Sequence, residues 1–263
     1  MKQPYARQFT LMEAVLRRQR LFLALVLLVV TLLSWLWIAA MARDMYGSMR
    51  GFAAWMMTPA WDATHLVLLW AMWAVMMVAM MLPSASPTLL LYLRAARVQE
   101  EKSQAALRVY ALAGGYLSVW AVFSVAATLL QRLLATREIL SPMMEPVSTV
   151  PTAALLLIAG AYQLSPLKRV CLRTCRSPLS FLIRRWQPGW IGAYRMGVEH
   201  GAWCLGCCWA LMLLLFAGGV MNLIVIVALS AWVLIEKLSP LGEHSARLSG
   251  VLLIGAAVWL LAR

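Results

Sequence analysis

The segment Leu21–Met41 decides the fold class, because it reads LFLALVLLVVTLLSWLWIAAM without a charged side chain. A helical run of about 20 apolar residues matches the hydrocarbon thickness of a bilayer. The apolar residues are continuous and do not alternate with polar ones, which excludes the strands of an outer-membrane barrel. The run is also too long for the apolar part of a secretory signal and lacks a small-residue cleavage site. We therefore expect a retained membrane span.

The composition extends this interpretation to the whole chain. Of 263 residues, 63% are hydrophobic and 13% are charged, and the mean hydropathy is +0.79. Soluble domains average about 45–50% apolar and about 25% charged residues. Too few polar side chains are available here to coat a water-facing surface, which excludes an ordinary globular fold and intrinsic disorder. We predict an all-α polytopic transmembrane helical bundle.

Seven apolar segments predict about seven spans. They are Leu21–Met41, Ala63–Leu82 (with a continuation to Tyr92), Ala111–Leu130, Thr149–Leu164, Met196–Phe216, Met221–Ile235 and Leu248–Ala262. The fourth, sixth and seventh are shorter than the roughly 17–25 residues that a span usually needs. Gly218 and Gly219 lie between the fifth and the sixth, which predicts a tight helical hairpin.

The positions of the basic residues predict the orientation. The chain has 23 Lys and Arg against 10 Asp and Glu, a formal charge of +13. With a cytoplasmic N-terminus and an outer C-terminus, 18 of these 23 lie in inner segments, as the positive-inside rule requires. Residues 1–20 would then be a basic cytoplasmic segment and residues 21–263 a single transmembrane helical domain. Because every inner segment carries some of the charge, we expect contact with the lipid bilayer and none with nucleic acid.

The fifth predicted span carries the strongest chemical motif, HGAWCLGCCW at residues 200–209. On a helix, His200, Cys204 and Cys208 share one face at i, i+4 and i+8, with Cys207 beside them. Imidazole and thiolate ligands suit Cu(I) or Zn(II), and Glu199 adds an ionisable group within the span. Cysteine also fills helix cores as a small apolar residue. Packing explains one or two cysteines better than three with a histidine, so we predict a metal site.

Methionines line the second predicted span. Met72, Met76 and Met80 follow one another at i, i+4 and i+8, and Met77 and Met81 form a parallel pair. Thioethers are soft, neutral ligands for Cu(I), although methionine also fills irregular helix contacts. Both interpretations stay open for this ladder.

The predicted outer loop adds a second group of methionines. They are Met41, Met45, Met49, Met56 and Met57. A surface that captures metal through thioethers would explain them, and so would a weakly amphipathic interfacial helix. Asp62 and His65 lie one turn apart near the same mouth, where the histidine could act at the interface without metal.

Cys171 and Cys175 follow the fourth predicted span in the sequence SPLKRVCLRTCRSP. The C-x₃-C spacing is not that of a zinc finger, and no second pair follows nearby in the sequence. Neighbouring arginines favour the thiolate form, and a disulfide is not expected to persist on the cytoplasmic side. A second soft-metal site, a redox-active pair and two incidental thiols all stay open.

Four stretches carry a family resemblance. They are Trp73–Pro83, Ala161–Lys168 with Cys171 and Cys175, Gly197–Met212, and Gly219–Leu223 leading to Glu236 and Lys237. In these the chain resembles a bacterial family of integral membrane proteins of unknown function that is described as metal-binding. The resemblance covers the chain from about residue 60 to its end. It implies a multi-pass protein of the bacterial inner membrane with a metal site at the cysteine-rich motif.

Together these features favour a membrane protein that binds Cu(I), with zinc as the alternative, for transport, transfer or homeostasis. The predicted ligands are Met76, Met77, Met80, Met81, Cys171, Cys175, Glu199, His200, Cys204, Cys207 and Cys208. A metallochaperone or another membrane subunit is the expected partner. No nucleotide-binding or catalytic constellation is visible, so we expect a binding protein rather than an enzyme. A thiol–disulfide oxidoreductase and a non-catalytic assembly subunit remain the alternatives.

Overall fold

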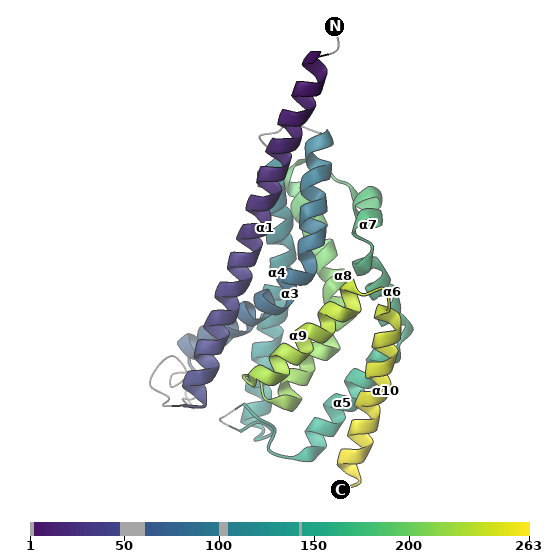
Figure 1. The fold of residues 1–263 in the computed structure, drawn as a ribbon. Coiled ribbons are helices and arrows are strands. Elements are labelled where there is room, and N and C mark those ends of the chain that lie inside the picture. The colour runs from purple at the N-terminus through teal and green to yellow at the C-terminus, as the bar shows by residue number, and fades with distance from the viewer. Residues whose placement is uncertain (1–2, 48–60, 100–104, 142–143) are drawn as a thin grey trace.

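The computed structural model describes residues 3–47, 61–99, 105–141 and 144–263, and these ranges form a bundle of α-helices without a β-strand (Figure 1). The helices are α1 (Gln3–Met45), α3 (Ala63–Gln99), α4 (Ala105–Thr136), α5 (Thr149–Leu164), α6 (Pro166–Arg176), α7 (Pro178–Arg185), α8 (Gly189–Gly218), α9 (Leu223–Leu238) and α10 (Gly242–Leu261). The predicted all-α class is confirmed.

Five helices in the described part of the chain are long and apolar enough to cross a membrane, namely α1, α3, α4, α8 and α10. Helices α5 and α6 pass the same test as a pair bent by 65°, which raises the number to six. The 16 residues of α9 fall short of the usual length. The prediction of about seven spans is therefore roughly met. The last span is longer than predicted because its helix begins six residues earlier, at Gly242.

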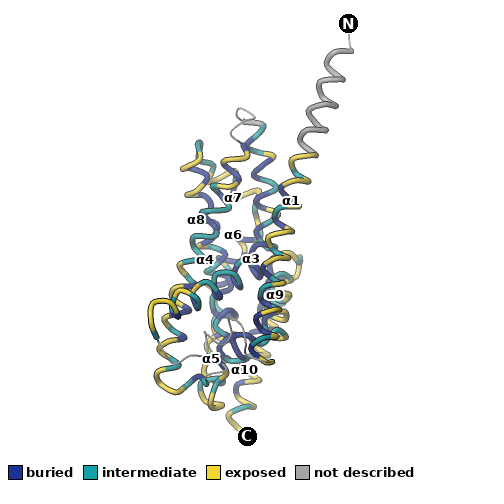
Figure 2. The backbone as a smooth tube through the Cα atoms, turned by 90° about the vertical axis from the view of Figure 1, so that its left-hand side faces the viewer, coloured by how far each residue is buried: buried dark blue, intermediate teal, exposed yellow. Residues whose placement is uncertain are grey.

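The long helices α1, α3, α4 and α8 run side by side along the molecule, with the two chain ends at opposite ends of the bundle (Figure 1). Helix α4 packs on α8, α3 packs on α4 and α1, and α10 packs on α5. Buried residues follow the inner faces of the bundle and exposed residues its outside (Figure 2). Many exposed side chains are large and apolar, such as Leu32 on α1 and Val122 on α4, as a lipid-facing surface requires.

Two helix breaks position the site described below. Ser165 and Pro166 separate α5 from α6, and the Ser165 hydroxyl caps α6 by accepting a hydrogen bond from the Lys168 N–H at 3.1 Å. The predicted hairpin after α8 is confirmed: Gly219 turns the chain at φ +90°, which favours glycine. The Asn222 side chain then caps α9. The first break folds α6 back against α8, and the second lays α9 alongside it.

Glycines bring α4 and α8 into backbone contact. A Cβ atom on Gly115 would overlap the carbonyl oxygen of Tyr194, and one on Gly197 would overlap that of Leu112. Small residues permit such close approach between membrane helices. This contact fixes the position of α8, the helix with the cysteine-rich motif.

Candidate metal site

Sulfur atoms from three helices meet in the interior of the bundle. Helix α8 supplies Cys204, Cys207 and Cys208, α6 supplies Cys175, and α3 supplies Met81. We call these five residues the sulfur cluster. All five are buried, and all five cysteines of the chain are free thiols. The helical spacing of the motif places the α8 thiols on the inner side of α8, where the break after α5 brings α6 to face them.

Close contacts connect the cluster. The Cys208 Sγ lies 3.9 Å from the Met81 Sδ, and the Cys175 thiol interacts with those of Cys204 and Cys207. The thiols of Cys207 and Cys208 each donate to the Cys204 carbonyl oxygen at 3.0 Å. Metal–sulfur bonds of about 2.3 Å in a trigonal arrangement separate the sulfurs by roughly 4 Å. The spacing of Cys208 and Met81 therefore suits shared binding of one soft ion.

The cluster depends on a mixed ligand set. Among the described residues, no group of three or more His, Cys, Asp or Glu side chains is placed so that it could hold a metal ion. The sulfur of Met81 completes the cluster from α3, and soft thiolate and thioether donors together are typical of Cu(I) sites. In the described part of the chain, these four ligand types alone, cysteine included, do not form a metal site in this conformation.

Lys237 of α9 reaches into the same cluster. Its Nζ lies 2.8 Å from the Cys204 Sγ, 3.7 Å from the Met81 Sδ and 3.8 Å from the Cys208 Sγ. Only 5% of the residue is exposed. In the sequence, Lys237 was counted only among the basic residues of the inner segments and was not predicted as a site residue. The sequence pattern that could have indicated a role for Lys237 is its position beside Glu236, directly after an apolar run. Ionisable residues inside membrane segments are functional candidates.

Tyr116 connects α4 to the cluster. Its hydroxyl donates to the Met81 carbonyl oxygen at 3.1 Å and lies 3.0 Å from the Cys204 Sγ. Tyr116 is fully buried, so this bridge holds α3 and α8 at one level of the bundle. Tyr116 was not among the predicted site residues, because a single tyrosine in an apolar helix carries no distinguishing pattern.

Cys171 lies one turn before Cys175 and packs against α8. A Cβ atom on Gly206 would lie 2.9 Å from the Cys171 Sγ, so the thiol occupies the space that this glycine leaves open. The Tyr162 hydroxyl donates to the Gly206 carbonyl oxygen from the end of α5. From the sequence, Cys171 and Cys175 were interpreted as a pair apart from the cysteine-rich motif of residues 200–209. The 65° bend after α5 instead brings α6 against the cysteine-rich motif.

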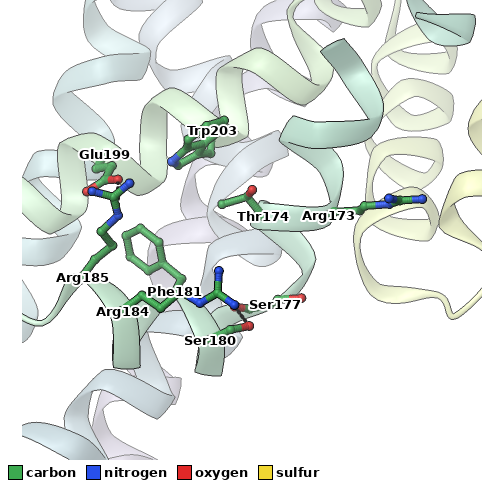
Figure 3. A pocket seen from close by; sticks show the side chains of 9 residues that line it. All are labelled: Arg173, Thr174, Ser177, Ser180, Phe181, Arg184, Arg185, Glu199 and Trp203. Carbon is green, nitrogen blue, oxygen red and sulfur yellow. Dashed lines mark hydrogen bonds and ion pairs between the residues drawn. The ribbon is translucent and has the colours of Figure 1, made fainter. Parts of the chain in front are cut away.

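His200 and Glu199 differ in their position relative to the sulfur cluster. The His200 ring is buried between Tyr116 and Phe181, at centroid distances of 5.8 Å and 5.3 Å, and its Nδ1 has no hydrogen-bond partner among the residues that the structure describes. The Glu199 carboxylate forms an ion pair with the Arg185 Nε at 3.1 Å and lines a different pocket (Figure 3). The structure thus brings His200 next to the cluster and turns Glu199 away from it.

The other methionines have varied positions. Met76, Met77 and Met80 are buried in the apolar core that includes the cluster, and Met41 and Met45 of α1 are buried there too. Met49, Met56 and Met57 lie outside the described residues. At the start of α3, the Asp62 carboxylate accepts from the His65 N–H at 2.8 Å, so this pair forms a helix cap.

A second buried group, the ion-pair network, lies beside the cluster. The Lys168 Nζ is 2.6 Å from the Glu236 carboxylate and also donates to the Gln163 side chain. Gln163 in turn donates to Glu236 at 2.7 Å and to Ser249 at 2.6 Å, and the Trp232 indole donates to Glu236 at 2.9 Å. These five residues connect α5, α6, α9 and α10. Each charge in the network has an opposite charge or a hydrogen-bond partner.

The comparison with known proteins agrees with this soft-ligand chemistry. Residues 70–260 match the family model described as PpoB2, copper chaperone. No curated protein and no solved structure matches the chain. The matched range contains every residue of the sulfur cluster, together with Lys237 and the ion-pair network. Because this range covers well over half of its length, the chain belongs to the PpoB2 copper chaperone family and has a copper-related function.

Proposed function

We propose that this protein binds Cu(I) in the sulfur cluster within the membrane and transfers it to an acceptor. The observation that carries the proposal is the meeting of thiols from α6 and α8 with the thioether of Met81 around Lys237. Sulfur ligands of both kinds are selective for soft, monovalent copper. Membership of a copper chaperone family supports copper over zinc.

Charge favours the same ion. A bare thiolate is costly in a membrane interior, and two or three of them require compensating positive charge. The Lys237 ammonium supplies one such charge at 2.8 Å from Cys204. Together with this ammonium, one monovalent ion neutralises the negative charge of two thiolates. We expect a divalent ion to be less well accommodated, because it would add a second unit of positive charge beside the same ammonium.

The remaining predicted ligands fit a transfer route. Met76, Met77 and Met80 precede Met81 on α3 and offer thioethers along the approach to the thiols. Cys171, on the turn of α6 before Cys175, offers the next thiol. We propose that the N-terminus is cytoplasmic, that residues 1–20 form a basic inner segment and that residues 21–263 form one domain of the bacterial inner membrane. A metallochaperone or another membrane subunit is the proposed acceptor.

The test is a Cu(I) titration of the full chain, purified in detergent without oxygen, against a chromophoric copper chelator. We expect Cys204→Ser with Cys208→Ser to weaken Cu(I) binding by more than about 100-fold, since each factor of ten corresponds to about 1.4 kcal/mol. X-ray absorption of the loaded protein should show sulfur as the ligand atom. Serine keeps nearly the volume of cysteine, so the unfolding temperature should change little.

Val198→Ala is the matched control, because Val198 lies on α8 off the cysteine face and is only partly buried. It should bind Cu(I) as the parent protein does. Equal affinities for the double serine variant and the parent, measured on folded protein, would remove the sulfur cluster from the proposal.

One observation favours a second function. The Cys175 thiol interacts with two thiols of α8, so a disulfide between α6 and α8 could form in a dithiol–disulfide cycle. Trapping the thiols in cells with an alkylating reagent and counting the modified cysteines separates the two functions. A copper site predicts five free thiols after metal removal, whereas an oxidoreductase predicts a population with three.

A further inference from the structure

We propose that the pocket between α6, α7 and α8 binds the phosphate of an anionic membrane lipid. Its lining contains three arginines, three hydroxyl side chains, two aromatic rings and one carboxylate (Figure 3). They are Arg173, Arg184, Arg185, Thr174, Ser177, Ser180, Phe181, Trp203 and Glu199. The pocket has a volume of about 340 Å³, within the range of ligand sites. It is separate from the sulfur cluster and takes no part in the proposed copper binding.

The charges of the pocket leave room for an anion. Arg173 is paired with Glu243 at 2.6 Å and Arg185 with Glu199 at 3.1 Å. Arg184 forms no ion pair with any residue that the structure describes, and it lies beside Ser177 and Ser180 (Figure 3). With Arg173 paired to Glu243 and Arg185 to Glu199, the guanidinium of Arg184 leaves the pocket with one excess positive charge. Guanidinium and hydroxyl donors are the groups that bind phosphate oxygens.

The surroundings of the pocket favour a lipid as the source of that phosphate. The exposed face of α7 carries Leu179 and Ile183, which are 59% and 72% exposed. Trp190 and Ile191, at the start of α8, are exposed as well. A short helix with apolar residues on one face and arginines at its end is typical of a membrane interface. The acyl chains of a bound lipid would cover these apolar side chains while its phosphate enters the pocket.

The predicted orientation agrees with this placement. The pocket lies on the segment between α5 and α8, which holds the densest group of basic residues and is expected on the inner side. Basic pockets between membrane helices on the cytoplasmic side are typical binding sites for anionic lipid headgroups. The occupant we infer is therefore a glycerophospholipid with net negative charge, for which phosphatidylglycerol is the probe.

The test compares thermal unfolding of the full chain in neutral detergent with added phosphatidylglycerol or phosphatidylcholine. We expect phosphatidylglycerol to raise the unfolding temperature by about 3 °C more than phosphatidylcholine does. Arg184→Gln should lose at least half of this difference, and Arg184→Lys should keep more of it. Arg94→Gln is the matched control, because Arg94 is an exposed arginine of α3 outside the pocket. It should keep the full difference.

Native mass spectrometry of the same samples counts the bound lipids directly and does not depend on the unfolding temperature. It should show a retained phosphatidylglycerol on the parent and on Arg94→Gln, and less on Arg184→Gln. Equal effects of the two lipids would overturn the proposal, and so would equal losses in Arg94→Gln and Arg184→Gln. Inorganic phosphate that stabilises the protein as much as phosphatidylglycerol would identify a free-anion site and overturn the lipid assignment.

Discussion

The sulfur cluster and the ion-pair network occupy neighbouring parts of the bundle, and two adjacent residues of α9 extend one into each. Glu236 turns toward Lys168, Gln163 and Trp232, whereas Lys237 turns toward Met81, Cys204 and Cys208. Successive residues of a helix point about 100° apart, so one step along α9 separates the two regions. Apart from the half-buried Trp232, both regions are buried; the network contains Lys168, and Lys237 lies against the cluster.

They differ in how completely their polar groups are paired. In the network, a carboxylate faces the ammonium and amide, indole and hydroxyl groups complete the hydrogen bonds. In the cluster, the ammonium faces sulfur atoms, which are weak hydrogen-bond acceptors but strong ligands for soft metals. A network whose polar groups are all paired with one another stabilises the fold and has no free donor or acceptor for a ligand. The sulfur atoms of the cluster keep their capacity to bind a ligand, which is why we propose the cluster as the functional region of the two.

The largest effect should come from breaking the network. Lys168→Met leaves the Glu236 carboxylate buried without its counter-charge, which is expected to destabilise the protein by about 3–5 kcal/mol. Thermal or denaturant unfolding in detergent measures this. Replacing both partners, as Lys168→Met with Glu236→Met, should restore much of the loss, because no unpaired charge remains. A double variant as unstable as the single one would show that the ion pair is not the source of the stability.

A change in the cluster should alter metal preference more than stability. Lys237→Met removes the ammonium that lies 2.8 Å from Cys204, so a divalent ion should then be accommodated better. We expect the preference for Cu(I) over Zn(II) to fall by about tenfold, which corresponds to about 1.4 kcal/mol. Competitive titration with the two metals measures this ratio. In Lys237→Arg, which keeps the positive charge, this preference for Cu(I) should fall less. An unchanged preference in Lys237→Met would show that the charge of Lys237 does not determine the choice of metal.

The smallest effect should come from the thioether. Met81→Leu keeps the volume but removes the sulfur that lies 3.9 Å from the Cys208 Sγ, so Cu(I) affinity should fall severalfold, by about 1 kcal/mol or less. Met77→Leu, one turn earlier on α3, is the matched control and should leave the equilibrium affinity unchanged. The same chelator titration serves for both. Equal losses in the two variants would assign the effect to packing of α3.

The fold class was predictable from the sequence because continuous apolar runs such as Leu21–Met41 have one stable form in a bilayer. Helix spacing also placed Cys204, Cys207 and Cys208 on a common face. Their partners were not predictable in this way. Whether α6 returns to α8 depends on the angle at Ser165 and Pro166, which is 65° here and which no local pattern specifies.

Packing between helices also explains why the sequence did not predict where Glu199 and Lys237 lie relative to the cluster. Glu199 adjoins His200 in the sequence, yet a helix turns adjacent side chains in different directions, and Arg185 pairs with the glutamate outside the cluster. Lys237, in contrast, was not predicted as a site residue although it contacts the cluster. The positive-inside rule already explained a lysine at this position, so the sequence suggested no role in the site. The packing of α9 shows that Lys237 contacts Cys204.

The glycine contact between α4 and α8 determines which wall of the site can move. The two backbones touch at Gly115 and Gly197, with no side chain between them that could change rotamer to allow sliding. Cys204 and its neighbours are therefore attached to the rigid wall. The opposite wall consists of α6, an 11-residue helix after a sharp bend, and α9, a 16-residue helix after a glycine turn. We therefore expect an ion bound by the thiols to enter through displacement of these short helices, while α4 and α8 stay together.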